Sequence, residues 1–511
     1  MNGAETVVRT LVSQGVDLCL ANPGTSEMHF LAAMDTQPGL RAVLALHENV
    51  ATGAADGFAR IAGRPASTLL HLGPGLANGL SNLHNASRAL SPVVNIVGDH
   101  AVAHRRLDAP LTSDIEALAR TVGVATRTAL PGADIAAETA STIAQARGPV
   151  PGVATLLLPA DTAWSEAPER PVAARAAEPP PSLPDAATLD AAAAALRLPG
   201  AVLFLGFGAV RGEALEAAGR IAAATGAALV GQTTNPVLER GLGRVCVERL
   251  PFAADAALRR LAGVPAMVLA GARAPVAFFA RPDQPGRLWP PGCALVELAA
   301  PHADAQAALL ALANRLGAHS AAGVRRHQAE PAPGGDSWIG QALASSLVEG
   351  CIVVDEALTH AVAIASATAS APPHLCLQNM GGSIGYGAPA ATGAALAAGG
   401  RPVITLIGDG SAMYTIQALW TQAREQLPVI TLIIANRAYR ILELEAARMQ
   451  VHPPGPAMQA ALHIGAPDLN FVQLAEGMGV PGRRVHNAAQ LAAALAEGLR
   501  ARGPLLIQVD I

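Results

Sequence analysis

The segment 403–436 constrains the fold most, because two apolar runs in it flank a glycine-rich turn and a helical stretch. The first run ends at Gly408-Asp409-Gly410, and the second ends at Asn436. This order predicts a strand, a tight turn, a helix that begins after Gly410 and a second buried strand. A right-handed crossover can make such strands parallel neighbours. We therefore expect Asp409 and Asn436 side by side at the carboxyl edge of a sheet.

The chemistry of these two side chains suits a hard cation that is bound to a phosphate, because both offer oxygen ligands. A helix N-terminus beside them adds backbone N–H groups that favour an anion. Glycines around Asp409 let the backbone approach a bulky anion closely. A Gly-Asp-Gly triplet alone is weak evidence, but a triplet and an asparagine that each follow a predicted strand form a much more specific pattern.

This arrangement resembles the signature of thiamine-diphosphate-dependent enzymes, the group of acetolactate synthase, benzoylformate decarboxylase and pyruvate decarboxylase. The resemblance covers essentially the whole chain. It implies an α/β fold of three doubly wound parallel-sheet domains: pyrimidine-binding (1–167), central (186–318) and diphosphate-binding (336–511). The Pro- and Ala-rich stretches 168–185 and 319–337 are interpreted as linkers.

The pattern of short apolar runs supports this fold independently, because runs that alternate with helical patterns predict parallel sheets covered by helices. At 511 residues the chain is also too long for one core, and its length suggests about three domains. The expected strands are 18–21, 42–46, 67–71, 93–97, 154–158, 202–205, 228–230, 267–270, 295–298, 403–407, 429–435 and 505–509, and a last helix is expected at 488–500.

Composition argues against several classes of partner. The net charge of −4 and the absence of a basic run argue against nucleic acid and a membrane surface, and 3% aromatic residues argue against a base-stacking platform. No apolar run reaches the roughly 20 residues that span a bilayer. The five cysteines are isolated, which indicates reduced thiols in a cytoplasmic protein. The N-terminal stretch "MNGAETVVRTLVSQGV" is typical of an amphipathic helix, so we expect no signal peptide.

The resemblance assigns the metal site. Thiamine diphosphate and Mg²⁺ are the implied cofactors, and the implied Mg²⁺ ligands are Asp409, Asn436 and the backbone carbonyl of Ala438. Two phosphate oxygens and a water would complete the six oxygens that magnesium favours. The family usually has paired asparagines here. Ala435 replaces the first of them, and Asn436 keeps the ligand position.

Further residues are expected to contact the diphosphate and the aminopyrimidine. Ile384 in "GGSIGYG" is the candidate buttress that bends the cofactor, because glycines on both sides leave one bulky side chain projecting. By resemblance, Gly382 offers its carbonyl to the amino group of the pyrimidine. The phosphate contacts are expected from Gly408, Gly410, Ser411, Thr359 and His360.

Glu48 is the predicted catalytic acid. It follows an apolar run and opens a helix whose next turns are small and apolar, "HENVATGAADGFAR". A poorly solvated carboxyl there can share a proton with a ring nitrogen of the cofactor. A glutamate at a helix N-terminus can also serve only the helix dipole, and the similarity to the family's glutamate motif favours the catalytic role.

The substrate side is less specific. His71 at a strand end is a candidate to orient or protonate the bound intermediate, and Thr25 in "NPGTSE" is a candidate contact for the substrate carboxylate. Asn78 instead matches the acetolactate synthase pattern. Ala280 stands where decarboxylase relatives carry a second catalytic histidine. Glu445 stands where they have an aromatic pocket wall, which favours a small aliphatic or polar 2-oxo acid over an aryl one.

The resemblance implies a 2-oxo acid decarboxylase and carboligase, a C–C lyase or transferase similar to acetolactate synthase. A benzoylformate decarboxylase-like enzyme without ligation is the nearest alternative. A flavin-assisted oxidase with bound FAD and a catalytically idle scaffold stay open but are not favoured. A nicotinamide dehydrogenase is suggested only by Gly206 and Gly208, without the rest of the fingerprint. Because Glu48 and Asp409 lie in different domains, the resemblance implies a homodimer or homotetramer with sites at the subunit interface.

Overall fold

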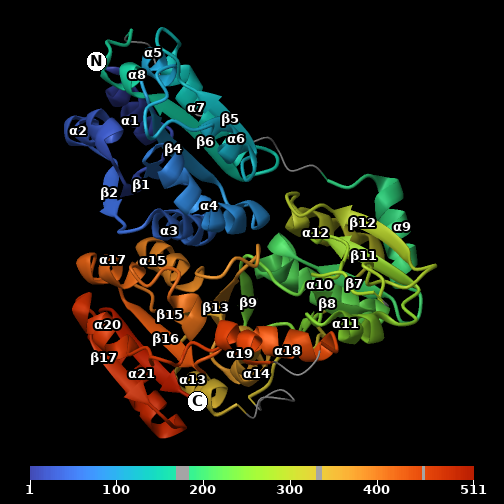
Figure 1. Ribbon diagram of the computed structural model, residues 1–511. Helices are drawn as coiled ribbons and strands as arrows, with labels where there is room; N and C mark the ends of the chain where they lie inside the picture. The colour runs from blue at the N-terminus through green and yellow to red at the C-terminus, as the bar shows by residue number, and fades with distance from the viewer. Residues whose placement is uncertain (169–182, 283, 330–336, 452–454) are drawn as a thin grey trace.

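The computed structural model describes residues 1–168, 183–282, 284–329, 337–451 and 455–511. Three sheets follow one another along the chain, coloured blue to cyan, green to yellow and, apart from β9 (Leu238–Arg240), orange to red in Figure 1. Helices pack on both faces of each sheet, so the predicted class of three doubly wound α/β units is confirmed. No helix within the described part of the chain has the length and hydropathy to cross a membrane.

The first sheet has the strand order β2-β1-β3-β4-β6-β5, and all its pairings are parallel. Helices α1, α2 and α7 cover one face, and α3, α4 and α6 cover the other. Its elements are α1 (Gly3–Ser13), β1 (Leu18–Asn22), η1 (Thr25–Glu27), α2 (Met28–Thr36), β2 (Arg41–Leu44), α3 (Glu48–Ala62), β3 (Ala66–Leu70), α4 (Leu72–Arg88), β4 (Val93–Asp99), α5 (Val102–Arg105), α6 (Ile115–Arg120), β5 (Ala125–Thr128), α7 (Ile135–Arg147), β6 (Val153–Pro159) and α8 (Ala160–Trp164).

The second sheet is also parallel, in the order β10-β8-β7-β11-β12. Its first connection passes through the glycine turn after β7. Its elements are α9 (Ala186–Leu196), β7 (Val202–Leu205), η2 (Phe207–Val210), α10 (Gly212–Thr225), β8 (Ala228–Gly231), β10 (Glu248–Arg249), α11 (Ala254–Leu261), β11 (Ala266–Ala270), β12 (Ala294–Ala299) and α12 (Ala305–Leu316).

The third sheet has the order β17-β18-β16-β15-β13-β14-β9, and its β9 strand (Leu238–Arg240) comes from the middle of the chain. β9 pairs antiparallel with β14, whereas the other pairings are parallel. The remaining elements are α13 (Trp338–Ser346), β13 (Ile352–Glu356), η3 (Leu358–His360), α14 (Ala361–Ala367), η4 (Thr368–Ser370), β14 (His374–Gln378), α15 (Gly387–Ala397), β15 (Val403–Gly408), α16 (Asp409–Ala412), α17 (Ala418–Arg424), β16 (Val429–Ala435), α18 (Arg440–Arg448), α19 (Pro456–Leu462), α20 (Phe471–Gly477), β17 (Gly482–Val485), α21 (Ala488–Ala501) and β18 (Leu505–Asp510).

Close packing of α3 against α15 joins the first and third units. A Cβ on Gly57 would lie 2.1 Å from the carbonyl oxygen of Ala390, and one on Gly393 would lie 1.8 Å from that of Ala54. Neither position tolerates a side chain, because the obstacle is backbone. The glycines in these two helices therefore set how closely the units approach.

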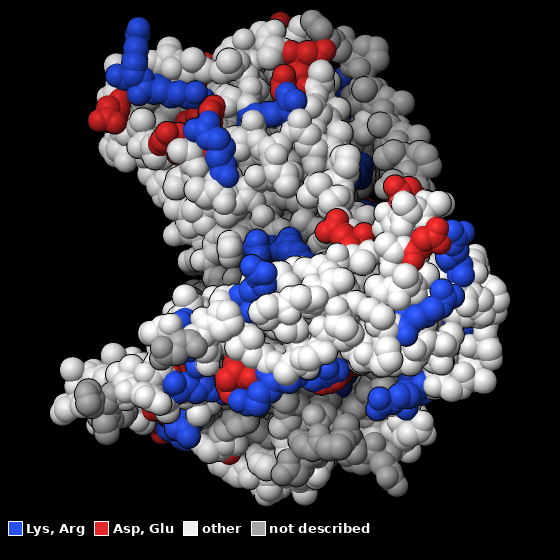
Figure 2. All heavy atoms as spheres, turned by 90° about the vertical axis from the view of Figure 1, so that its right-hand side faces the viewer, with Lys and Arg blue, Asp and Glu red and all other residues white. Residues whose placement is uncertain are grey.

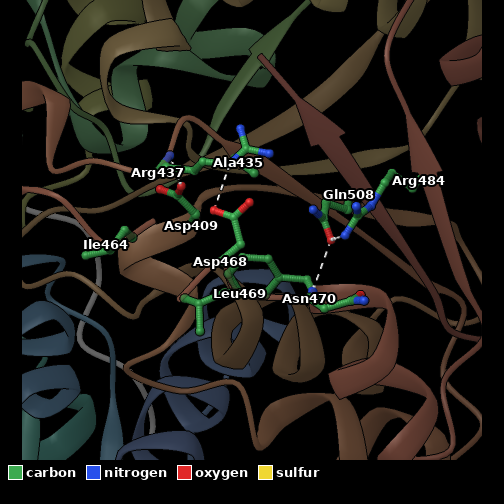
Figure 3. A pocket seen from close by; sticks show the side chains of 10 residues that line it. Asp409, Ala435, Arg437, Ile464, Asp468, Leu469, Asn470, Arg484 and Gln508 are labelled. Carbon is green, nitrogen blue, oxygen red and sulfur yellow. Dashed lines mark hydrogen bonds and ion pairs between the residues drawn. The ribbon is translucent and has the colours of Figure 1, made fainter. Parts of the chain in front are cut away.

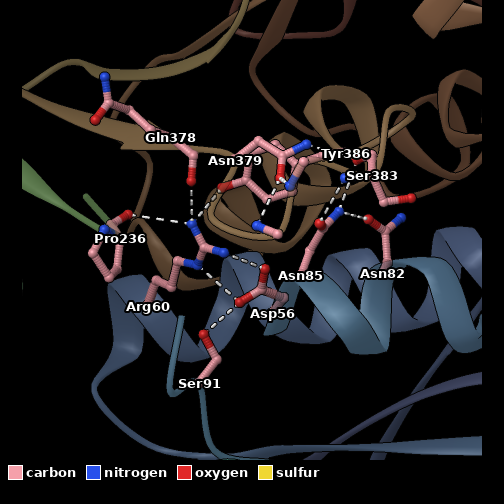
Figure 4. A network of polar contacts seen from close by, with 12 residues as sticks. Asp56, Arg60, Asn82, Asn85, Ser91, Pro236, Gln378, Asn379, Ser383 and Tyr386 are labelled. Atoms are coloured by element: carbon pink, nitrogen blue, oxygen red, sulfur yellow. Dashed lines mark hydrogen bonds and ion pairs between the residues drawn. The ribbon is translucent and has the colours of Figure 1, made fainter. Parts of the chain in front are cut away.

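A buried ion pair beneath this contact links all three units (Figure 4). The guanidinium of Arg60 donates to Asp56 in its own helix, at 2.8 and 2.6 Å. It also donates to the carbonyls of Pro236 and Gln378 and to the hydroxyl of Tyr386, at 3.3, 2.7 and 2.8 Å. One side chain thereby fixes the relative positions of three segments that are far apart in sequence.

The predicted strands are all present, with ends that differ by at most two residues. The central prediction is confirmed: β15 and β16 are parallel neighbours, and Gly408 pairs with Ile434. The helix after the turn begins earlier than expected, at Asp409, and lasts only four residues. The sequence patterns did not predict β5, β9, β10, β13, β14 or β17. Most of the stretch interpreted as the first linker, and residues 330–336 of the second, lie outside the described residues.

Candidate active site

A cavity opens at the carboxyl edge of the third sheet, where β13, β15 and β16 end. It collects all the residues that the sequence assigned to the metal and the diphosphate. Its lining is Ala357, Leu358, Thr359, His360, Gly408, Asp409, Gly410, Ser411, Ile434, Asn436, Ala438, Tyr439, Arg440 and Ile441.

Asp409 is the charged centre of this cavity, with only 3% of its surface exposed. Its Oδ1 accepts from the backbone N–H of Gly410 at 2.9 Å, and its Oδ2 accepts from that of Arg437 at 2.6 Å. Burial raises the pKa of the Asp409 carboxyl, and the backbone amides oppose that rise. Nearby, Asn436 Oδ1 accepts from the N–H of Ala438 at 3.0 Å, which brings all three predicted ligand residues to one turn.

Backbone strain marks the same edge. Leu358 and Arg437 have φ of 48° and 59°, and each is the second residue past the end of its strand. Leu72 and Phe207 occupy the same position after β3 and β7, with φ of 48° and 45°. Such a conformation costs about 1–3 kcal/mol for a residue other than glycine and concentrates at functional sites. These four positions lie at carboxyl ends of strands, where ligands bind in this kind of sheet.

The donor groups fit a magnesium-bound diphosphate. The hydroxyl of Ser411 is buried and has no hydrogen-bond partner among the described residues, so it offers an unused donor inside the cavity. Asp409 and Asn436 supply hard oxygen ligands, as Mg²⁺ requires. The ring of Tyr439 packs closely against Gly410, since a Cβ on Gly410 would lie 2.5 Å from this ring.

The loop that carries Ile384 is fastened beside this cavity by a residue the sequence analysis did not identify. The carboxylate of Glu356, at the end of β13, accepts from the backbone N–H groups of Gly385, Tyr386 and Gly387 at 2.8, 3.3 and 2.7 Å. Burial raises its pKa to about 7, and the three amides lower it by less. The only sequence signal is an acidic residue at the end of the apolar run "CIVVDE".

Two asparagines of α4 hold the same loop from the first unit (Figure 4). Asn85 Nδ2 donates to the carbonyl of Ser383 at 2.9 Å, and Asn82 Nδ2 donates to that of Gly385 at 3.2 Å. Asn85 also accepts from the N–H of Ser383, at 3.2 Å. Ile384 thus projects from a loop whose neighbouring peptides are hydrogen-bonded on both sides.

The remaining predicted residues gather at the carboxyl edge of the first sheet. Thr25, Glu48 and His71 follow β1, β2 and β3 respectively. Glu48 and His71 are close together: a Cβ on Gly75 would lie 3.4 Å from both Glu48 Oε1 and His71 Cβ. Glu48 is partly exposed at the start of α3, and its Oε2 accepts from Asn78 at 3.1 Å.

His71 is oriented by a buried carboxylate that the sequence analysis also missed. Its Nδ1 lies 2.8 Å from Glu27 Oε2 and 3.2 Å from Ser26 Oγ. Glu27 in turn accepts from the backbone N–H of Gly24 at 2.7 Å. A carboxylate on Nδ1 leaves Nε2 as the ring nitrogen that can serve a ligand.

The first-sheet residues and the diphosphate cavity are separate within one chain, since no residue of the described segment 1–168 lines that cavity. Figure 2 shows the molecule hollowed at its left edge, at the height where the first and third units meet. Arginine and acidic side chains alternate across the face in view.

The two departures noted in the sequence have structural outcomes. Ala280 is exposed on the loop between β11 and β12 and offers no proton donor. Glu445 is not a free carboxylate, because it accepts from Arg281 at 2.6 Å and from Arg448 at 2.5 Å. In the second unit, a Cβ on Gly206 would lie 2.6 Å from the side chain of Gln232, so the protein itself fills the space at this glycine turn.

A second cavity, of about 200 Å³, lies on the other side of Asp409 (Figure 3). Arg437 donates to Asp468 at 3.0 Å, and Arg484 donates to Gln508 at 3.4 Å. Arg484 Nε also lies 3.7 Å from Asp510 Oδ2, so both arginines have an acidic neighbour, and the cavity borders the turn that follows β16.

Comparison with known proteins agrees with this geometry. The family model described as "Thiamine pyrophosphate enzyme, N-terminal TPP binding domain" matches residues 1–133, and the one described as "Thiamine pyrophosphate enzyme, C-terminal TPP binding domain" matches residues 359–509. The chain belongs to the thiamine-diphosphate-dependent enzymes, as the resemblance in its sequence predicted.

Within this family the chain is similar to two functional groups. It is 49% identical, over 100% of its length and 99% of the relative's, to the "Putative acetolactate synthase large subunit IlvX" of Mycobacterium tuberculosis. It is 30% identical to a benzoylformate decarboxylase of Pseudomonas aeruginosa, over 97% of its length and 96% of the relative's. Among solved structures, a thiamine-diphosphate-dependent 4-hydroxybenzoylformate decarboxylase of Rhodococcus jostii has a TM-score of 0.84 at 25% identity, covering 100% of this chain and 99% of that one.

Proposed function

We propose that this protein is a thiamine-diphosphate- and Mg²⁺-dependent decarboxylase of 2-oxo acids that joins the retained fragment to a second carbonyl compound, as an acetolactate synthase does. The observation that carries the proposal is the cavity at the third sheet, where the ligand residues Asp409 and Asn436 meet the unpartnered hydroxyl of Ser411. When bound there, the cofactor supplies the carbon nucleophile and the electron sink for decarboxylation.

The protein's own groups would divide the remaining work. Asp409, Asn436 and the carbonyl of Ala438 would hold the metal, and Ser411 would contact a phosphate oxygen. Ile384 would buttress the bend in the cofactor. We propose that Glu48 exchanges a proton with the aminopyrimidine ring nitrogen.

The substrate contacts are assigned to Thr25 and His71. His71 is the best-placed group to give or take a proton near the substrate, since Glu27 holds its Nδ1 side. Because Glu48 and His71 lie apart from the diphosphate cavity of their own chain, we propose that each site pairs the first unit of one subunit with the third unit of another. The working unit would then be a homodimer or a dimer of dimers.

Ligation is favoured over simple release by two observations. The relative with 49% identity is named as an acetolactate synthase subunit, and Ala280 stands at the position where decarboxylase relatives carry a second catalytic histidine. Benzoylformate decarboxylase-like release is the second candidate, favoured by the relative at 30% identity and by the structural similarity to the 4-hydroxybenzoylformate decarboxylase.

The test is to incubate protein loaded with thiamine diphosphate and Mg²⁺ with a mixture of 2-oxo acids and aldehydes, and to identify the products by mass. Hydroxyketones that contain both fragments are expected. Aldehydes alone would favour the second candidate, and the absence of carbon dioxide from every acid would refute both. Glu48→Gln provides the control and is expected to lose the activity.

A further inference from the structure

Aromatic residues are distributed unevenly over this molecule. Five of its eight phenylalanines are buried in the cores of the three units. The other three, Phe252, Phe278 and Phe279, are 37%, 48% and 59% exposed, and they touch one another. The ring centroids of Phe252 and Phe278 are 4.8 Å apart, and those of Phe278 and Phe279 are 6.2 Å apart. The exposed phenylalanines therefore form one cluster instead of being scattered singly.

This cluster stands beside the candidate active site. Cε1 of Phe278 lies 3.7 Å from the position of a Cβ built on Gly382, on the loop that presents Ile384. Gly382 is itself exposed and has a φ of 80°, which favours glycine. The Phe278 ring thus faces the backbone that is expected to contact the aminopyrimidine.

An ion pair holds the aromatic loop in this place. Arg281 Nη2 lies 2.6 Å from Glu445 Oε2, and both side chains are only 13% exposed. Glu445 belongs to α18, whose first residues, Arg440 and Ile441, line the diphosphate cavity. The loop therefore contacts both the Ile384 loop, through Phe278, and α18, through Arg281.

The same ion pair neutralises the charge of Glu445 at the wall of the expected substrate pocket, which we define as Phe278, Phe279 and Glu445. An apolar substrate side chain that covered a free Glu445 would cost free energy, because the carboxylate would lose its water, but here Glu445 is hydrogen-bonded to Arg281 and Arg448. Beside the Ile384 loop, the described part of this segment presents the exposed ring of Phe278, with Phe279 in contact with it. An exposed apolar surface of this kind gains free energy when an apolar ligand covers it.

We propose that Phe278 and Phe279, braced by Phe252 and by the Arg281–Glu445 pair, select 2-oxo acids whose side chain is apolar and larger than methyl, a phenyl ring included. The proposal rests on the proposed 2-oxo acid chemistry and names the side-chain class. It revises the sequence-based expectation that Glu445 disfavours aryl acids. Acids with charged side chains would be poorer substrates, because the rings of Phe278 and Phe279 offer no partner for a charge.

The experiment compares kcat/KM for benzoylformate, 4-methyl-2-oxopentanoate and pyruvate in the wild type and in a Phe278→Ala, Phe279→Ala double variant. The ratio of each larger acid to pyruvate is expected to fall about tenfold or more in the double variant. Leu198→Ala is the matched control, since Leu198 is a half-exposed apolar residue that precedes β7. It therefore lies at the amino end of the strands of the second sheet, whereas Phe278 and Phe279 follow the carboxyl end of β11. A ratio that changes less than twofold would overturn the proposal.

Binding provides a second readout that does not depend on turnover. Benzoylphosphonate and acetylphosphonate resemble 2-oxo acids but cannot lose carbon dioxide, and calorimetry gives their affinities for the cofactor-loaded protein. The wild type is expected to prefer benzoylphosphonate, and the double variant to lose that preference about tenfold. If the wild type turns over no 2-oxo acid, the proposed function fails, and this binding preference alone then decides the inference about the wall.

A charge reversal tests the brace. Arg281→Glu alone places two carboxylates together and should lower the preference for the larger acids. The double variant Arg281→Glu, Glu445→Arg restores the pair and should recover the preference to within about threefold of the wild type. If the reversed pair did not recover the preference for the larger acids, the role of the ion pair would be refuted. The role of Phe278 and Phe279 would then be decided by the double alanine variant.

Discussion

Removing the Arg60 guanidinium should destabilise the protein more than any exposed charge would. In Arg60→Met the side chain keeps its length but loses five hydrogen bonds, two of them to Asp56. Asp56 would stay buried, with the hydroxyl of Ser91 as its remaining side-chain partner in the described structure. The carbonyl of Gln378 and the hydroxyl of Tyr386 would also lose their donor.

The expected cost follows from burial. Both side chains of the pair are almost fully buried, at 2% and 0% exposure. Removing one partner of such a pair typically costs 3–5 kcal/mol, because the other charge stays buried without compensation. We therefore expect Arg60→Met to lower the free energy of unfolding by about 4 kcal/mol. Urea titrations followed by circular dichroism measure this quantity in the first cooperative transition.

The control removes both charges. In Asp56→Leu, Arg60→Met no uncompensated charge remains, so the double variant should be more stable than Arg60→Met by about 1–4 kcal/mol. If Arg60→Met cost less than about 1 kcal/mol, or if the double variant were the less stable of the two, the view that this pair holds the three units together would be wrong.

Three further predictions concern the site. Glu356→Gln removes a carboxyl whose pKa is raised to about 7, so the folded state holds its proton more tightly than the unfolded chain. The stability of the wild type relative to this variant should therefore fall as pH rises from about 4.5 to about 7, by about 3 kcal/mol in urea titrations, and a difference that grew with pH would contradict it. Glu27→Gln should lower kcat/KM about tenfold in steady-state assays, because a neutral amide oxygen is a weaker acceptor for His71 Nδ1 than the carboxylate, and a change within twofold would exclude that role. Co-expressed Glu48→Gln and Asp409→Asn chains should regain about a quarter of wild-type activity, since random pairing makes half of the dimers mixed, with one intact site each, and no recovery would count against sites shared between subunits.

The sequence predicted the strands and turns around Asp409 and Asn436 well because its signals are local. Two apolar runs, the Gly-Asp-Gly triplet and Asn436 specify the strand ends directly. The parallel pairing of β15 and β16 then brings Asp409 next to the turn that follows β16. The expected start of the following helix was wrong by a few residues, since Asp409 itself opens it. Local patterns set the element and not its first residue.

The residues that support the site could not be predicted in this way, because their roles arise from contacts between distant segments. Glu27 is significant only through His71, and Glu356 only through the loop around Tyr386. Glu445 seemed from its position alone to put a charge in the substrate pocket. Its partner Arg281 lies in another unit of the chain, and only the folded structure brings the two together.

The most direct test of the central claim is a calorimetric titration of metal-free, cofactor-free protein with thiamine diphosphate, with and without Mg²⁺. The site built around Asp409, Asn436 and Ser411 predicts saturable binding of one cofactor per chain that requires Mg²⁺ and is lost in Asp409→Asn. Binding of equal strength in that variant, or no binding by the wild type in the presence of Mg²⁺, would contradict the account.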